Sequence, residues 1–426
     1  MQICFMLYLP NELLALIATY LPRESLRILT QVSRLFREVA APPFFQLLRF
    51  EPPQAPVVLN IEYAVLEALS IWRRTNAFIL PDSIWFSVTG ATTDCHLNVL
   101  GVFFESLKGY ESFPRVHLQL LTAPRQPTHS FVRLLNCIQV SGCKNLHCHD
   151  VQQTYGVPRA DLKLSSFTRA APSCFSKLEV LEMTSSLLFS PAVIPFTVTT
   201  LYNSPISRLI LKNTSLTAAQ WSTLLGHLSM QHLRSLEVDD SCPAYSLVTF
   251  LARHNVRDLT FSQGHPTVSR SSRAPVCLPL PSLEHLDGPP ACIHSLASFA
   301  MLPTTLESLT VRFRQSSSEV PLLEEVLACA AYFPELDELH VRIPAETDRC
   351  LLETPRQPVP SCLVKVLFLM CFDSPKHDII VRLIVMYTLL LNDMTPDSHT
   401  ALPGWRSSHV LTDSTYLLIA QNLINN

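Results

Sequence analysis

The densest group of side chains that could perform chemistry lies between residues 137 and 150. It consists of Cys137, Cys143, His147, Cys148, His149 and Asp150. Thiolate and imidazole groups bind Zn²⁺, and structural zinc sites usually pair them at C-x2-C and H-x3-H spacing. The spacing here matches neither pattern, and no second pair of cysteine ligands lies nearby. The sequence therefore predicts no metal site, and we interpret Cys137 and Cys143 as residues of a folded repeat.

Other catalytic groupings do not occur in the sequence. The adjacent acids Asp239-Asp240 and Glu324-Glu325 would point in different directions on a strand or helix, which is typical of solvated surfaces. No glycine-rich phosphate loop, G-x-S-x-G turn or H-E-x-x-H sequence is present. We therefore expect no cofactor and a protein that is not an enzyme.

Composition narrows the class of protein. Of the 426 residues, 48% are hydrophobic and 16% are charged, so the chain can bury a large core. A net charge of −3 gives no basic field for nucleic acid. The apolar run from Ile379 to Leu391 contains Arg382 and is too short to cross a membrane. The 13 scattered cysteines indicate reduced thiols in the cytoplasm, the nucleus or both.

The first fifty residues predict two amphipathic helices. Apolar residues recur at helical spacing after Pro10, and again from about Glu24 to Val39, where Pro42-Pro43 should end the second helix. Two helices of this size cannot bury both apolar stripes by themselves. Either the rest of the chain or a partner must cover the surplus.

This segment resembles the F-box motif, with an ending similar to that of many fungal members. The resemblance rests on Leu9-Pro10-x-Glu12-Leu13-Leu14-x-x-Ile17, Leu21-Pro22, Ser25-Leu26 and Val32-Ser33-Arg34-x-Phe36-Arg37. It implies docking onto the Skp adaptor of cullin–RING ubiquitin ligases. Phe36 stands where tryptophan is common. The residues implied in docking and in the module's core are Leu9, Pro10, Leu13, Leu14, Ile17, Leu21, Leu26, Leu29, Val32 and Phe36.

A second pattern, apolar-x-x-apolar-x-apolar, recurs along most of the remaining chain. From residue 178 its starting positions are separated by 23 to 30 residues, close to the period of leucine-rich repeats. The instances are Leu135–Ile138–Val140, Leu178–Leu181–Met183, Ile206–Leu209–Leu211, Leu233–Leu236–Val238, Val256–Leu259–Phe261, Leu283–Leu286 (with Gly288 in the sixth position), Leu306–Leu309–Val311, Leu336–Leu339–Val341 and Leu363–Val366–Phe368. Such units bury their apolar faces by stacking.

The resulting fold class is α/β: an F-box helical module followed by a leucine-rich-repeat-like solenoid, with parallel strands on the concave face and helices behind. The predicted domains are 1–50, the F-box-like helices; 51–130, a linker with irregular first repeats; 131–373, the repeats; and 374–426, a cap or loose tail. Short strands are expected at Val57–Leu59 and Ile84–Val88. His377–Leu391 is expected to form a capping helix.

If the repeats form, alternate strand residues face outward and could bind a target protein. The candidates are Arg208, Lys212, Glu237, Asp239, Asp258, His285, Arg312, Glu338, His340 and Arg342. The predicted function is a target-recognition adaptor of a Skp–cullin–F-box ubiquitin ligase. Its partners would be the Skp adaptor, through it cullin and RING subunits, and an unknown protein substrate. The alternative is a leucine-rich-repeat scaffold whose N-terminal helices only cap the solenoid.

Overall fold

The computed structural model describes residues 9–62, 65–110, 114–121, 128–150, 176–239, 241–262, 278–303, 306–312, 328–330, 332–333, 336, 338–344, 365–373 and 378–387. Of residues 341–344, 365–373 and 378–387 it describes the backbone alone. The chain divides into two compact units, Met1–Ser246 and Leu247–Asn426. No helix within the described ranges is long and apolar enough to cross a bilayer.

The described part of the first unit begins with the helices α2 (Asn11–Thr19), α3 (Arg23–Val32) and α4 (Arg34–Leu47). The prediction of one helix from Glu24 to Val39 is wrong, because the backbone is extended at Ser33, with φ −154° and ψ 168°. The Ser33 side chain accepts a hydrogen bond from the backbone N–H of Phe36 at 3.2 Å and so caps α4. Serine at that position was the signal for the break.

Helix α4 also continues through Pro42 and Pro43, where the sequence predicted an end. Each proline removes one backbone donor and normally weakens a helix interior. Here the flanking residues Ala40, Ala41 and Phe44 are almost completely buried. Tertiary packing therefore holds the helix together across the two prolines.

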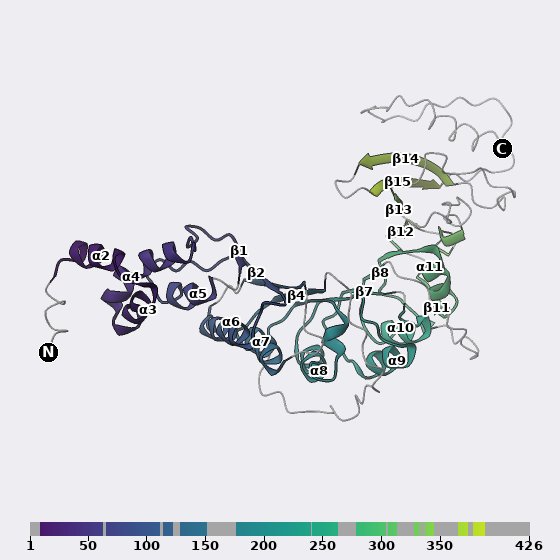
Figure 1. The fold of residues 1–426 in the computed structure, drawn as a ribbon. Coiled ribbons are helices and arrows are strands. Elements are labelled where there is room, and N and C mark those ends of the chain that lie inside the picture. The colour runs from purple at the N-terminus through teal and green to yellow at the C-terminus, as the bar shows by residue number, and fades with distance from the viewer. Residues whose placement is uncertain are drawn as a thin grey trace, which may run out of the picture. The chain divides into compact units, whose positions relative to one another are not determined.

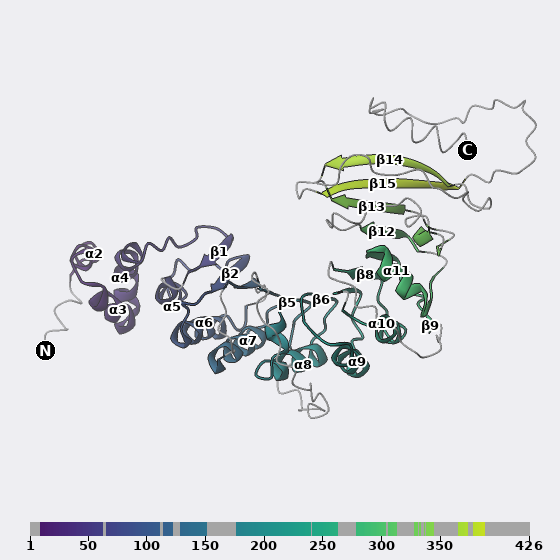
Figure 2. The same cartoon turned by 45° about the vertical axis from the view of Figure 1, so that its right-hand side comes forward.

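After these helices in the sequence come the parallel strands that form the sheet of the first unit. Their order across the sheet is the same as their order along the chain. They are β1 (Val58–Ile61), β2 (Ser83–Val88), β3 (Arg115–Leu120), β4 (Asn145–Asp150), β5 (Val180–Thr184), β6 (Arg208–Leu211) and β7 (Ser235–Val238). The connecting helices are α5 (Leu66–Trp72), α6 (Asp94–Ser106), α7 (His129–Val140), η3 (Ser186–Phe189), α8 (Ile194–Asn203) and α9 (Ala218–His227). Both ribbon views show α6 to α9 on one face of this sheet (Figures 1 and 2).

A row of buried leucines crosses the sheet of the first unit. Leu146 pairs in register with Leu181, Leu181 with Leu209, and Leu209 with Leu236. All four are at most 1% exposed. Because side chains alternate along a strand, this row fixes which residues of β4 to β7 face the helices and which face away.

Helix α10 (Ala244–Leu251) spans the boundary between the units. In the second unit, β8 (Asp258–Phe261), β10 (His285–Gly288), β12 (Ser308–Arg312) and β13 (Glu338–Pro344) pair in parallel. Strand β15 (Asp378–Tyr387) then pairs antiparallel with both β13 and β14 (Lys365–Asp373). The remaining elements are β9 (Leu278–Pro279), β11 (Ala300–Met301) and α11 (Pro290–Ala297).

The repeating apolar pattern located strands β5 to β8, β10, β12 and β13, each of which begins two residues after the start of its pattern. Strands β1 and β2 were expected from short apolar runs outside the repeat, and both lie within two residues of the expected positions. Leu135–Val140 is wrong, because it lies in helix α7. The expected helix His377–Leu391 is also wrong over the part described, where β15 is a strand. Of the expected strand at 363–368, residues 365–368 are described and belong to β14, which pairs antiparallel with its neighbour β15.

Gly288 explains the one repeat without an apolar residue in the sixth position. A Cβ atom added to Gly288 would lie 2.9 Å from Cδ2 and 3.2 Å from Cβ of Phe261 on the same sheet. Phe261 is buried. The aromatic ring of β8 therefore occupies the space that a side chain on β10 would need.

We predict that Gly288→Ala lowers the free energy of unfolding by about 1–3 kcal/mol, the usual cost of overpacking a core. The matched control is Gly226→Ala in helix α9, where an added Cβ meets nothing within 4 Å. That change should be neutral or stabilising, because alanine favours a helix. Urea unfolding of both variants measures the difference, and equal stability would contradict the packing argument.

Candidate functional site

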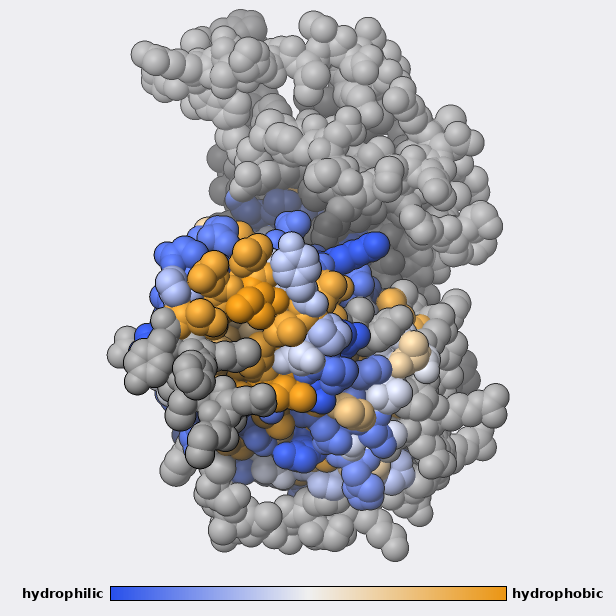
Figure 3. Space-filling view, turned by 60° about the vertical axis from the view of Figure 1, so that its left-hand side comes forward, coloured by the Kyte–Doolittle hydropathy of each residue, from blue (hydrophilic) through white to orange (hydrophobic). Residues whose placement is uncertain are grey.

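The N-terminal helices expose an unusual amount of apolar surface. Leu13, Leu16 and Ile17 of α2 and its C-cap residue Tyr20 lie at helical spacing on one face and are 46%, 54%, 39% and 81% exposed. Ile28 and Val32 lie one turn apart on α3 and are also exposed. We call these six residues the apolar surface. The view that brings the N-terminal helices forward shows hydrophobic side chains gathered among hydrophilic ones (Figure 3).

The ten residues implied in docking and core packing range from buried to exposed. Leu14, Leu26 and Phe36 are buried and form the core of the module. Leu9, Leu21 and Leu29 are half-buried, whereas Pro10, Leu13, Ile17 and Val32 are exposed. Sequence reasoning missed Leu16, Tyr20 and Ile28, although their helical spacing with Leu13, Ile17 and Val32 was a readable signal.

The opposite side of the module packs on the rest of the first unit. Phe45 and Phe50 contact each other edge to face with ring centroids 5.3 Å apart, and Phe50 contacts Trp72 of α5 at 5.7 Å. The Glu38 carboxylate accepts a hydrogen bond from the Asn76 backbone N–H at 2.9 Å. The helices therefore have one buried face and one exposed apolar face.

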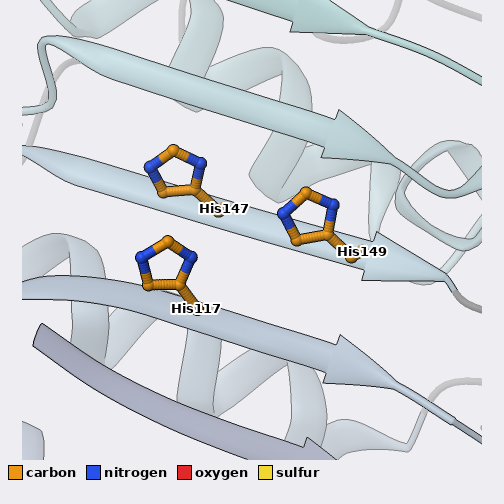
Figure 4. Close-up of side chains that lie close together, drawn as sticks. All are labelled: His117, His147 and His149. Atoms are coloured by element: carbon orange, nitrogen blue, oxygen red, sulfur yellow. The ribbon is translucent and has the colours of Figure 1, made fainter. Parts of the chain in front are cut away.

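A second cluster lies on the strand face that points away from the helices. His117 on β3 is in register with His147 on β4, and their rings stack with centroids 4.4 Å apart. Trp85 on β2 stacks on the other side of His117 at 4.2 Å. His149 follows two residues after His147 (Figure 4). We call His117, His147 and His149 the histidine cluster.

Glutamate and threonine residues of β5 contact two of these rings. Glu182 Oε2 lies 2.7 Å from His147 Nδ1, and Thr184 Oγ1 lies 3.0 Å from His149 Nδ1. Burial opposes ionisation of Glu182, but its hydrogen bond with His147 and nearby positive charge lower its pKa overall. Burial lowers the pKa of His117 to about 4 and also lowers that of His149. His117 and His149 are therefore neutral at pH 7.

The structure separates the cysteine, histidine and aspartate residues between 137 and 150. Cys148 and Asp150 are buried on the opposite side of β4 from the two histidines. Cys137 lies in helix α7, and Cys143 is buried before β4. Burial raises the pKa of Cys143 to about 12, so its thiol stays protonated. His117 comes from another strand, β3. The alternation of apolar and polar residues from Arg115 to Leu120 was the only feature of the sequence that could have placed His117 on the outward face of a strand.

Charged residues proposed for target binding mostly pair with each other. In the first unit Lys212 and Glu237 form an ion pair of 2.7 Å, and Arg208 is exposed. Of the candidates in the second unit, His285 pairs with Asp258 at 2.8 Å, Arg312 with Asp287 at 2.6 Å, and His340 with Glu338 at 3.1 Å. The side chain of Arg342 lies outside the described part of the chain.

Asp239 is a correction to the predicted face, because its side chain is buried. Its Oδ2 accepts hydrogen bonds from the backbone N–H and hydroxyl of Thr214 at 3.1 and 2.9 Å. Its Oδ1 accepts from the backbone N–H of Ser241 at 3.2 Å and from the Ser241 hydroxyl. The chain turns just after β7, so this carboxylate organises two loops and does not project outward.

Comparison with known families finds one match. Residues 6–46, about a tenth of the chain, match the family model of F-box-like domains. The chain therefore contains an F-box-like domain, and this domain coincides with α2, α3 and most of α4. F-box domains in general bind Skp-type adaptors. No curated protein and no solved structure matches the chain.

Two adjacent leucines of the domain differ in burial, because Leu14 lies in the core and Leu13 lies on the exposed surface. We predict that Leu14→Ala, at a side chain only 4% exposed, lowers the free energy of unfolding by about 2–5 kcal/mol. Leu13→Ala, at a side chain 46% exposed, should change it by less than about 0.5 kcal/mol. Urea unfolding followed by helical circular dichroism compares the two. A reversed order would show that α2 is rotated from the described position.

Proposed function

We propose that this chain is the target-recognition subunit of a Skp–cullin–F-box ubiquitin ligase. The observation that carries the proposal is the apolar surface on the F-box-like domain. Monomeric proteins rarely leave so many large apolar side chains together in water, and such surfaces usually bind another protein. The ligase chemistry would reside in other subunits, and this chain would have no catalytic role.

The spacing of the exposed residues indicates how the adaptor would bind. Leu13, Leu16, Ile17 and Tyr20 follow the i, i+3, i+4, i+7 pattern by which an amphipathic helix enters an apolar groove. Burying these side chains in the adaptor would remove them from water at a gain of roughly 25 cal/mol per Å² of apolar area. The buried core beneath them would keep the helix rigid for binding.

We further propose that the strand–helix units form a leucine-rich-repeat solenoid that holds the target. The parallel pairing of β1 to β7 in the first unit and of β8, β10, β12 and β13 in the second supports this assignment, as does the buried row of leucines. The outward-facing charged residues of both signs mostly form ion pairs with one another. A surface of this kind favours a protein target that carries both positive and negative side chains. The reduced thiols favour the cytoplasm or nucleus as the place of action.

A capping role for the N-terminal helices has its own support. Phe45, Phe50 and Trp72 are buried together where the module meets α5. Removing residues 1–50 would therefore expose the ring of Trp72, whatever else the module does. Capping uses the aromatic face, and adaptor binding would use the apolar surface, so point substitutions distinguish the two roles where truncation does not.

We predict that the double variant Ile17→Glu, Val32→Glu loses capture of the Skp adaptor in a pull-down while keeping its thermal unfolding midpoint. Both side chains are exposed, so the charges cost little in the free chain but would be buried in the complex.

The control is Val102→Glu, because Val102 on α6 is 47% exposed and lies outside the F-box-like domain. This variant should capture the adaptor as the wild type does. A folded wild-type chain that captures no adaptor would refute the proposed function and leave the capping role.

A further inference from the structure

The histidine cluster contains side chains that could bind a metal ion, although the spacing of these residues in the sequence does not match the H-x3-H spacing of structural zinc sites. His117, His147 and His149 each offer one ring nitrogen, and these atoms lie within 4.8 Å of one another. All three side chains project from the same strand face of β3 and β4 (Figure 4). We infer that they bind one divalent transition-metal ion, with Zn²⁺ as the expected occupant.

Hydrogen bonding fixes the tautomers of two of the rings. The Glu182 carboxylate can only accept, so the Nδ1 of His147 must carry the proton. The Thr184 hydroxyl donates to the Cys148 carbonyl at 3.1 Å, so it accepts from the Nδ1 of His149. Because Nδ1 is engaged in these hydrogen bonds, Nε2 is the nitrogen that each of the two rings can offer to a metal ion.

Residues other than the three histidines also favour metal binding, because they orient the histidine rings. Metal-binding histidines usually donate their other N–H group to a carboxylate or another oxygen, which orients the ring. Glu182 and Thr184 provide those oxygens for His147 and His149. His117 has a buried Nδ1 without a hydrogen-bond partner among the described residues, which is a cost that a ligand would offset.

The rings must turn to bind an ion. They are nearly parallel, with 13° between His117 and His147 and 16° between His147 and His149. A tetrahedral Zn²⁺ with bonds of about 2.0–2.1 Å holds its ligand nitrogens about 3.4 Å apart. Rotation about the Cβ–Cγ bond of histidine is soft, so converging the nitrogens costs little.

Imidazole ligands suit Zn²⁺, Cu²⁺ and Ni²⁺ better than Mg²⁺ or Ca²⁺, which prefer oxygen. Three protein ligands also leave the fourth position of Zn²⁺ for water or for a side chain of a bound protein.

A second group, Glu284, His285 and Glu307, also has three possible ligand atoms close together, but both the imidazole of His285 and the carboxylate of Glu307 are exposed. It provides a matched control.

The test uses the full-length chain without a histidine tag, stripped with a chelator and titrated with Zn²⁺, then with Co²⁺ as a spectroscopic probe. We expect one equivalent of metal, and visible Co²⁺ bands without the near-ultraviolet absorption of thiolate ligands. Glu182→Gln keeps an acceptor for His147 but loses the charge, and it should weaken binding about 10- to 100-fold. Each of His117→Ala, His147→Ala and His149→Ala should weaken binding further.

His285→Ala should leave the metal affinity unchanged, and circular dichroism should show that every variant is folded. Metal should also raise the unfolding temperature of the wild type but not that of His147→Ala. Failure of the wild type to bind Zn²⁺ would overturn the inference. So would loss of binding in His285→Ala, or full binding by the three cluster variants. None of these outcomes depends on binding of the Skp adaptor.

Discussion

Within each unit, the parallel pairing of strands that each contribute a buried apolar residue to a shared row is the constraint on which the described structure depends. In the second unit the row runs through Leu259, Leu286, Leu309 and Leu339, as it does through other leucines in the first. A single strand–helix unit cannot bury such a residue alone, so each unit requires its neighbours. The same row decides the other face, because a shift by one residue would exchange buried and outward side chains.

The histidine cluster is a direct consequence of that register. With Val116 and Leu146 paired toward the helices, His117 and His147 must be paired on the other face. The F-box-like domain shows an analogous division on helices. Leu14 and Ala18 face the core of the module, which leaves Leu13 and Ile17 on the surface. In both places the buried set determines which residues remain for binding.

Local periodicity made much of the fold predictable. Patterns such as Leu233–Leu236–Val238 located strands because period-two burial is encoded in a few adjacent residues. The same pattern was misleading at Leu135–Val140, since positions three apart also share one face of a helix. Between 378 and 387, an apolar run could not distinguish helix from strand, and pairing with β13 decided it.

The candidate sites were predictable only where they are local. The helices of the F-box-like domain were found from one short segment, although which apolar residues are exposed depends on packing against α4. The histidine cluster could not be found, because His117 and His147 are 30 residues apart in the sequence and meet through strand register. Burial of Asp239 likewise depends on a loop at Thr214 that no local pattern reveals.

Hydrogen–deuterium exchange of the full chain, with and without the Skp adaptor, would locate the docking surface. We expect slower exchange in α2 and α3 when the adaptor is bound, with the strands of both units unchanged. Protection confined to the sheets, or no protection anywhere in residues 11–32, would contradict the assignment of the exposed helical face as the docking surface.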